Sequence, residues 1–326
     1  ESLSQTFNPK ILLPESDIKE VILVLNGIAK DIPFAAIPIE FSAELFKGQE
    51  RPKPNPKYRG LKVIENRQTE NRITVTRHLI ENFMISHYPF AGMLAVKNML
   101  AHAGSAAVTE RKFVGLSLTE IPRKSTNIFE LDLILESLPD LKATKEEIEE
   151  VGSEFLVSNR VILSNKNATA KKLVEATKNN RPFLMSFATH AVNSNEWKTE
   201  QSSLVIYGDT EKTISLLDPN TIAGIGIGAD NVFLSACETY SSNAASVGLG
   251  NTLVSSFLLN GSRSVLTSTI PVEDNATRKL MSLIAKDLVP DKFPKLSRSF
   301  QKSVKKLLQS EYAHPRFWSG FRVMGE

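Results

Sequence analysis

A single cysteine and one histidine each follow an apolar, strand-like run of the sequence. Residues 232–236 lead directly to Cys237, and residues 182–188 are followed by Thr189 and His190. Ligands of an open α/β sheet bind in the crevice at the carboxyl ends of its strands, so the two side chains would share one edge if these strands are neighbours. A thiol and an imidazole in that arrangement predict nucleophilic catalysis by Cys237, with His190 as its base.

Each residue also has a structural interpretation when it is taken singly. A free cysteine is among the most buried residue types and usually packs as a small hydrophobe. A histidine in an apolar neighbourhood is more often a satisfied core or surface residue than a catalyst. The repeated pattern, in which an apolar run ends at a polar, turn-prone sequence, favours the catalytic interpretation of Cys237 and His190.

The segments around both residues resemble the paired His and Cys motifs of the CHAT family, caspase-like cysteine peptidases related to separases and metacaspases. These segments are Phe-Ala-Thr-His at 187–190 and Leu-Ser-Ala-Cys-Glu-Thr at 234–239. Further matches follow in family order over nearly the whole chain: Asn-Gly at 26–27, Ile-Pro-Phe-Ala-Ala-Ile at 32–37, Leu-Pro at 138–139, Ala-Thr at 168–169, Gly-Leu-Gly at 248–250, Phe-Leu-Leu-Asn-Gly at 257–261, Arg-Ser-Val at 263–265, Pro-Val-Glu-Asp-Asn-Ala-Thr at 271–277, His-Pro at 314–315 and Phe-Trp-Ser-Gly-Phe at 317–321. One departure is Ala191, which stands where the family usually has glycine.

The resemblance implies an α/β, caspase-like three-layer fold with a mostly parallel central sheet flanked by helices. It implies a smaller degenerate caspase-like lobe at residues 1–108, followed by the peptidase lobe at residues 109–326. Cys237 would attack the scissile bond, and His190 would take the thiol proton and later protonate the leaving amine. Backbone N–H groups of Ala191 and Cys237 would form the oxyanion hole, although a position that requires a positive φ would favour glycine over alanine.

Acidic residues near the proposed site would line a pocket for a basic side chain before the scissile bond, as kinship with separases and metacaspases implies. The candidates are Asp218, Glu238, Glu273 and Asp274. Each has an alternative role as a helix cap or a solvated loop charge. Glu273 and Asp274 precede a predicted helix, where the dipole favours carboxylates, and we favour the cap interpretation for Asp274.

The resemblance also implies a regulated enzyme. The peptidase would be held inactive until a sensor or partner domain releases it, and such domains in this family include tetratricopeptide repeats and modules linked to bacterial immunity. The alternative is a catalytically inert CHAT-like scaffold that binds a protein partner, to which Ala191 points. A serine hydrolase is disfavoured because no Gly-x-Ser-x-Gly elbow is present.

The composition is that of an ordinary globular protein of 326 residues. A net charge of +3 on a body of this size predicts no direct nucleic acid binding. One cysteine excludes an intrachain disulfide and a Cys-cluster zinc site, so we expect a cytoplasmic protein without a metal or other cofactor. No apolar run approaches the roughly 20 residues that span a bilayer, so we expect no membrane association. The first residue is Glu1 rather than Met, as expected of a fragment or a processed product.

Hydrophobic periodicity predicts strands that alternate with helices, and hence a mostly parallel sheet covered on both faces. Strands are predicted at residues 21–25, 73–75, 113–118, 161–163, 182–188, 232–236 and 264–268, with a hairpin across 203–217. Helices are predicted at residues 90–101, 128–138, 145–155, 168–177, 252–259, 275–288 and 295–308. Asn167 or Thr169 would cap the helix at 168–177. The prolines within 47–58 and the glycines within 222–228 predict loops. The basic side chains of residues 295–308 predict a solvated helix face.

Overall fold

The computed structural model describes residues 19–24, 32–45, 71–89, 93, 110–122, 132, 135–192, 202–209, 213–235, 252–270, 273–291 and 295–326. The predicted loop at 47–58 lies outside these residues, as do most of the predicted helices at 90–101 and 128–138.

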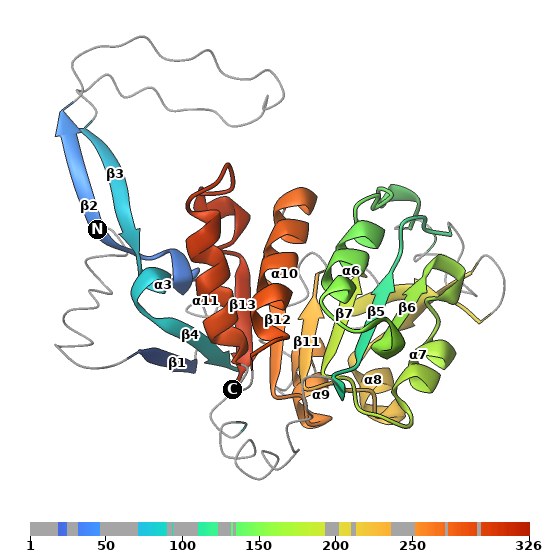
Figure 1. The fold of residues 1–326 in the computed structure, drawn as a ribbon. Coiled ribbons are helices and arrows are strands. Elements are labelled where there is room, and N and C mark those ends of the chain that lie inside the picture. The colour runs from blue at the N-terminus through green and yellow to red at the C-terminus, as the bar shows by residue number, and fades with distance from the viewer. Residues whose placement is uncertain are drawn as a thin grey trace.

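An eight-stranded sheet forms the middle layer of the molecule (Figure 1). Its strands, in spatial order, are β1 (Glu20–Val24), β4 (Met84–Tyr88), β13 (Phe321–Gly325), β12 (Ser264–Ser268), β11 (Asn231–Leu234), β7 (Leu184–Ala188), β5 (Phe113–Ser117) and β6 (Arg160–Ser164). Neighbouring strands are parallel except β12 and β13, which are antiparallel. The predicted mostly parallel sheet is therefore confirmed.

The central strands send alternate side chains into two separate hydrophobic cores. In β7, Met185 and Phe187 belong to one core, and Leu184 and Ala188 belong to the other. Successive side chains of a strand point to opposite faces, so a strand covered on both sides must be apolar at nearly every position. This explains why β7 and β11 stand out in the sequence as mostly apolar runs, with one polar residue in each.

Helices cover both faces of the sheet, which gives the three layers. On one face lie α6 (Thr144–Ser153), α10 (Asp274–Leu288) and α11 (Leu296–Leu307). The other face packs against α7 (Ala170–Thr177), α8 (Pro219–Ile225), α9 (Leu253–Leu259) and a three-stranded antiparallel sheet of β8 (Ala191–Val192), β9 (Ser203–Tyr207) and β10 (Ile214–Leu217). β9 and β10 are the predicted hairpin.

Smaller elements complete the described part of the chain. β2 (Pro38–Leu45) and β3 (Asn71–His78) pair antiparallel with each other, and β3 leads into the short helix α3 (Leu79–Asn82). The 3-10 turns are η2 (Phe34–Ala36), η5 (Val157–Asn159), η6 (Asn165–Asn167) and η8 (Pro315–Phe317). None of the helices in the described residues is long and apolar enough to cross a membrane.

Side-chain caps decide where several helices begin. The Thr169 hydroxyl accepts a hydrogen bond of 3.3 Å from the backbone N–H of Lys172, so Thr169 rather than Asn167 is the cap of α7. The prediction of a loop at residues 222–228 is wrong for residues 222–225, which belong to α8. The helix is followed by its C-cap Gly226, which has a φ of 66°. A left-handed glycine after the last turn is a common helix ending.

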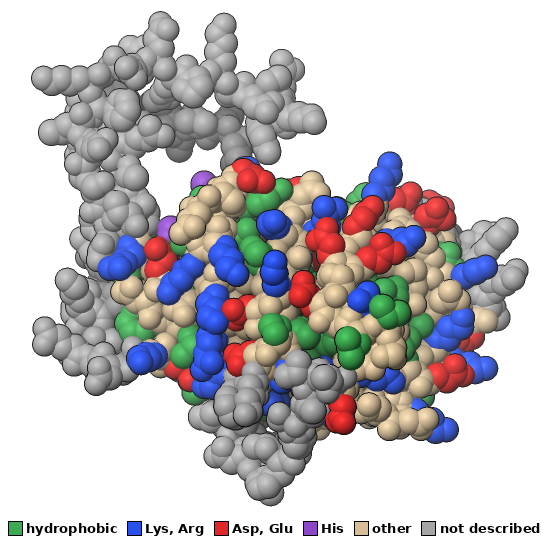
Figure 2. Space-filling view, viewed as in Figure 1, with side chains coloured by type: hydrophobic (Ala, Val, Ile, Leu, Met, Phe, Trp, Pro, Cys, Tyr) green, Lys and Arg blue, Asp and Glu red, His purple; other side chains and the backbone are tan. Residues whose placement is uncertain are grey.

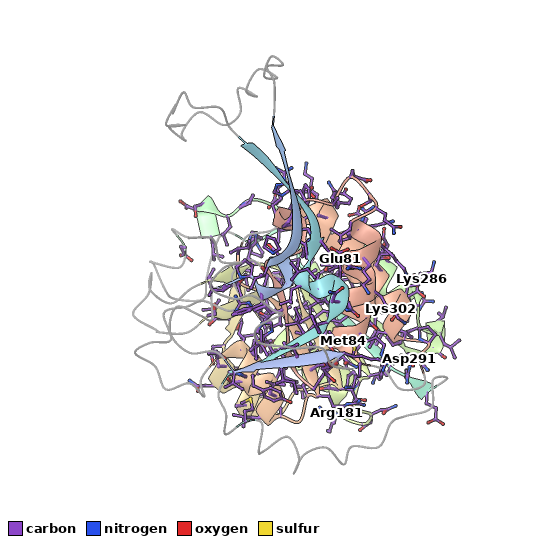
Figure 3. All side chains as sticks on the ribbon, turned by 90° about the vertical axis from the view of Figure 1, so that its left-hand side faces the viewer. Glu81, Met84, Arg181, Lys286, Asp291 and Lys302 are labelled. Atoms are coloured by element: carbon purple, nitrogen blue, oxygen red, sulfur yellow. The ribbon has the colours of Figure 1, made fainter. Side chains whose placement is uncertain are left out.

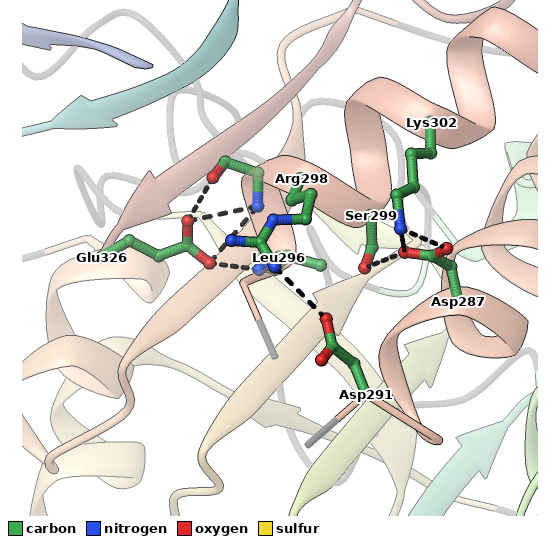
Figure 4. A network of polar contacts seen from close by, with 8 residues as sticks. Asp287, Asp291, Leu296, Arg298, Ser299, Lys302 and Glu326 are labelled. Carbon is green, nitrogen blue, oxygen red and sulfur yellow. Dashed lines mark hydrogen bonds and ion pairs between the residues drawn. The ribbon is translucent and has the colours of Figure 1, made fainter. Parts of the chain in front are cut away.

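The carboxylate of Glu326 contacts the first turn of α11 (Figure 4). It accepts hydrogen bonds from the backbone N–H groups of Leu296 and Ser297, with Ser297 N 3.2 Å from Oε2. These donors would otherwise be unsatisfied at the start of the helix, and the helix dipole favours a negative charge there. Burial raises the pKa of Glu326, and the hydrogen bonds from Ser297 and Leu296 lower it.

The outer faces of α10 and α11 carry charges of both signs. Lys and Arg side chains are interspersed with Asp and Glu in Figure 2, and Lys286 and Lys302 lie on the outer side of these helices in Figure 3. Lys302 Nζ lies 3.0 Å from Asp287 Oδ1, and Arg298 Nη1 lies 3.6 Å from Asp291 Oδ2. Such exposed pairs contribute little to stability and keep the face solvated, as the sequence predicts.

Candidate active site

The two strands that precede His190 and Cys237 are neighbours in the sheet. β7 and β11 are parallel, with Leu234 opposite Phe187. His190 follows Phe187 by three positions, and Cys237 follows Leu234 by the same number. The two strands are therefore neighbours, as a shared edge for His190 and Cys237 requires. Cys237 lies outside the described residues, so its pairing with His190 stays a prediction.

His190 is buried, with 8% of its surface exposed, and its backbone is fixed by β9. The N–H of Val205 donates to the carbonyl of His190 at 2.9 Å. The hydroxyl of the preceding Thr189 donates to the carbonyl of Val205 at 2.7 Å. The segment that carries the imidazole is thereby tied on both sides to the second sheet, which limits its movement at the end of β7.

The ring of His190 is oriented by the loop before α6. Its Nε2 atom lies 2.8 Å from the carbonyl oxygen of Pro139. A carbonyl oxygen only accepts hydrogen bonds, so this contact places a hydrogen on Nε2. In the neutral ring, Nδ1 is then the basic nitrogen, which is the state that a general base requires. Leu-Pro at 138–139 is a sequence motif here, but nothing in the sequence assigns a role to its carbonyl.

His190 lines a pocket at the carboxyl end of the sheet, between the starts of α6 and α10. The starts of these two helices lie at the edge of the sheet where β7, β11 and β12 end. The lining residues are Leu141, Ala143, Thr144, Glu147, Thr189, His190, Ser235, Ser268, Asp274, Thr277 and Phe321. Because Ser235 is two residues before Cys237, the pocket adjoins the strand end on which the nucleophile is predicted.

The four acidic candidates fall into different settings. Asp274 lines the pocket with His190, and burial raises its pKa, Glu273 adds to that increase and His190 opposes it. Glu273 caps α10 by accepting hydrogen bonds from Asn275 N at 3.2 Å and Ala276 N at 2.8 Å. The cap is therefore Glu273, and the cap interpretation of Asp274 is wrong, because Asp274 is the first residue inside the helix.

The remaining two candidates lie away from the described pocket or outside the described residues. Asp218 caps α8, since its carboxylate accepts hydrogen bonds from Thr221 N at 2.8 Å and Thr221 Oγ1 at 3.1 Å. It is not among the residues that line the pocket. Glu238 lies outside the described residues. A role of these acids in substrate binding stays a prediction.

Ala191 adopts a backbone conformation that does not require glycine. It begins β8 and pairs with Leu204 of β9. Among the described residues, the non-glycine positions with positive φ are Asn165 and Glu326, so Ala191 has a negative φ. Replacing the glycine usual in the family therefore introduces no backbone strain here. The oxyanion roles of the N–H groups of Ala191 and Cys237 stay predictions.

Glu147 is a pocket residue that the sequence analysis does not single out. It is 4% exposed, and burial raises its pKa to about 8. The nearby Ser235 hydroxyl lowers this pKa, although the two groups do not meet the geometry of a hydrogen bond within the described residues. Glu147 belongs to an acidic helix, yet it stands one turn before the buried Val151. That position on the apolar side of α6 is the signal that could have identified it.

No group of three or more metal-ligating side chains that could hold an ion occurs among the described residues. The site as described offers an imidazole, two carboxyl groups and several hydroxyls. Acid and base chemistry is what this set of groups can perform.

A comparison with known proteins identifies the family of the chain. The model of the CHAT domain matches residues 1–326. No curated protein matches the sequence. The fold is similar to that in the complex of the pro- and mature domains of Porphyromonas gingivalis RgpB, with TM-score 0.54 and 12% identity over 99% of this chain and 68% of that chain.

Two further solved structures are similar. The Arg specific cysteine proteinase gingipain R gives a TM-score of 0.53 at 11% identity, with 99% of this chain and 66% of that chain covered. The Saccharomyces cerevisiae separase–securin complex gives 0.42 at 12% identity, with 75% of this chain and 14% of that chain covered. The chain thus spans about two thirds of the gingipain chains. The mostly parallel sheet between two helical layers is the fold of caspase-like cysteine peptidases, and the chain belongs to the CHAT domain family.

Proposed function

We propose that the protein is a cysteine endopeptidase that cleaves protein substrates with Cys237 as nucleophile and His190 as base. The observation that carries this proposal is the register of β7 and β11, which gives both residues the same offset from facing strand positions. The contact between His190 Nε2 and Pro139 O supports it, because the contact selects the ring tautomer that a base requires.

The reaction would proceed through an acyl-enzyme. Only the thiolate is a good nucleophile, so His190 takes the proton from Cys237 as the sulfur attacks the scissile carbonyl carbon. The N–H groups of Ala191 and Cys237 stabilise the negative oxygen. The C–N bond then breaks, and the imidazolium returns its proton to the leaving amine. Water, deprotonated by His190, hydrolyses the thioester and releases the acid and the thiol.

Asp274 supports a preference for a basic side chain before the scissile bond. Among the candidate acids that the structure describes, Asp274 is the one that lines the pocket with His190. A cation in the pocket would offset the cost of burying this carboxylate. The similar gingipain R is described as Arg specific. Glu238 would contribute from the segment after Cys237, and Asp218 and Glu273, which cap α8 and α10, would be further acids of the substrate pocket.

Residues 1–108 would act as a degenerate caspase-like supporting lobe for the peptidase lobe at residues 109–326. β1 and β4 from the first segment join the central sheet through β13, which gives such a lobe direct contact with the catalytic one. A sensor or partner domain, including tetratricopeptide repeats, would release the restrained enzyme in a role such as bacterial defence. The inert scaffold remains the alternative. It was suggested by Ala191 in place of the glycine usual in the family, but the negative φ of Ala191 means that glycine is not required at this position.

A cleavage assay with a protein-derived peptide library tests the proposal. Cys237→Ala is expected to abolish cleavage, and His190→Ala is expected to reduce kcat/KM by at least about a hundredfold, the usual contribution of a general base. His314→Ala is the matched control, because this histidine is exposed and contacts the backbone N–H of Arg316. Cleavage that persists unchanged in Cys237→Ala would contradict the proposal.

A further inference from the structure

Glu147 is a buried carboxyl group in the pocket that also contains His190. It is 4% exposed and lines the pocket together with Ser235 and Asp274. Its Oε1 atom and the hydroxyl of Ser235 are both buried and lack a hydrogen-bond partner within the described residues. Buried polar atoms are rarely left unpaired, so two of them in one pocket indicate a function that outweighs their cost to stability.

The titratable groups around Glu147 do not neutralise a carboxylate at that position. They are Glu150 on α6, Asp274 and Arg278 on α10, and His190 at the end of β7. Arg278 pairs with Glu150, at 3.3 Å between Nε and Oε1. Burial is the main cause that raises the pKa of Glu147 to about 8, Ser235 and Arg278 oppose it, and Asp274 and Glu150 add to it. Below that pH the group is an uncharged carboxylic acid.

We propose that Glu147 is a positioning residue of the active site, kept as an uncharged acid so that no further negative charge faces the strand end at Ser235. This inference rests on the proposed function, in which the chain two residues after Ser235 supplies the nucleophile. Two peptide units span at most about 7 Å, so the Cα atom of residue 237 must lie within that distance of the Cα atom of Ser235.

The physical reason is repulsion between like charges. Attack requires a thiolate, and a second anion close to a thiolate raises the pKa of the thiol. Asp274 already brings one carboxylate to this pocket. A buried glutamic acid at position 147 fills the space between α6 and the end of β11 with a polar group, while it adds no charge until the pH exceeds its raised pKa.

The rate at which iodoacetamide alkylates Cys237 tests this inference without a substrate. The sequence has one cysteine, so alkylation of the full chain reports on that thiolate alone. Glu147→Gln has the shape of the neutral acid but cannot ionise. The ratio of its alkylation rate to that of the parent is expected to rise from about one near pH 6.5 to about 1.5 near pH 9, because raising a thiol pKa near 8.5 by half a unit lowers the thiolate fraction at pH 9 by that factor. Glu146→Gln, an exposed neighbour on α6, should follow the parent throughout.

A constant ratio for Glu147→Gln across this pH range would overturn the inference. Ser235→Ala gives a second test that does not alter Glu147. The Ser235 hydroxyl lowers the pKa of Glu147, so its removal should raise that pKa. The pH at which ionisation of Glu147 slows the alkylation of Cys237 should then be higher, and a shift of this pH to a lower value would also overturn the inference. If the library assay finds no cleavage while these alkylation profiles change as expected, the proposed function fails, and the effect of Glu147 on the ionisation of the Cys237 thiol stands.

Discussion

Backbone groups of two distant segments contact His190. Its carbonyl accepts from Val205, its ring donates to Pro139, and the adjacent Thr189 is tied to the same strand β9. Two of these contacts connect the end of β7 to Val205 of β9, and the third connects it to Pro139 in the loop before α6. A hydrogen bond from Nε2 to a carbonyl oxygen favours the tautomer with its hydrogen on Nε2, which leaves Nδ1 as the basic nitrogen.

The buried acid at position 147 gives stability a specific pH dependence. Its pKa is raised to about 8 in the folded protein from 4.5, so the folded state binds the proton more tightly than the unfolded state between these values. Stability is therefore lost as the pH rises through this window, by up to about 1.4 kcal/mol per pH unit. Glu147→Gln should unfold at higher urea concentration than the parent near pH 8, with the difference shrinking toward pH 4.5.

Equal differences in urea midpoint at both pH values would contradict that expectation. Glu149→Gln serves as the control because Glu149 is exposed and pairs only loosely with Lys145, at 3.8 Å. It should leave the pH dependence of unfolding as it is in the parent.

At the scale of elements, the starts of two helices meet at the pocket. α6 and α10 both begin at the pocket, and the Thr144 hydroxyl, at the start of α6, donates to the carbonyl of Leu118 just after β5. α11 begins instead at Glu326, whose carboxylate replaces a local cap, since Lys295 offers no capping side chain. A residue that follows the last strand thus secures the helix covering that strand.

Removal of this distant cap should loosen α11. Glu326→Ala leaves the N–H groups of Leu296 and Ser297 without their acceptor, and a lost helix cap costs about 1 kcal/mol in typical cases. The free energy of unfolding from urea titration measures the effect. Glu311→Ala, at an exposed position after the same helix, should change it by less than about 0.5 kcal/mol. A cost for Glu326→Ala no larger than that of the control would show that water satisfies these donors equally well.

At the scale of the whole molecule, β13 joins two sets of parallel strands. It pairs antiparallel with β12 over five residues and parallel with β4 on its other side. The candidate site lies in the set that runs from β12 to β6, where β7 and β11 are buried along their whole length. β1 is an edge strand, and Ile22 and Val24 are 44% and 37% exposed. Rigidity should therefore be greatest where the two site segments begin.

Hydrogen exchange measured by mass spectrometry should show this gradient. Amides of Leu184–Ala188 are expected to exchange much more slowly than those of Glu20–Val24, because exchange in the centre of a buried sheet requires a larger opening than exchange at its edge. Equal protection of the two strands would mean that the sheet opens as one unit, including the positions that precede His190.

The sequence by itself determined the α/β class, most of the strands and helices, and the placement of His190 and Cys237 after apolar runs. Local patterns suffice for these features, because a strand buried on both faces must be apolar throughout and an amphipathic helix must repeat its apolar side chains. The sequence missed α8, although Asp218 and Pro219 form an N-terminal signal, because the glycines that follow resemble a loop.

Only the tertiary structure decided which strands are neighbours, which carbonyl orients His190, and which acid lies in the pocket. These features depend on contacts between residues far apart in the chain, such as Pro139 with His190. The pKa of Glu147 is of the same kind, because desolvation arises from the packing of α6 and α10 on the sheet and not from its sequence neighbours. Ala191 gives the clearest case, since its backbone angle, set by pairing with β9, decides whether the missing glycine matters.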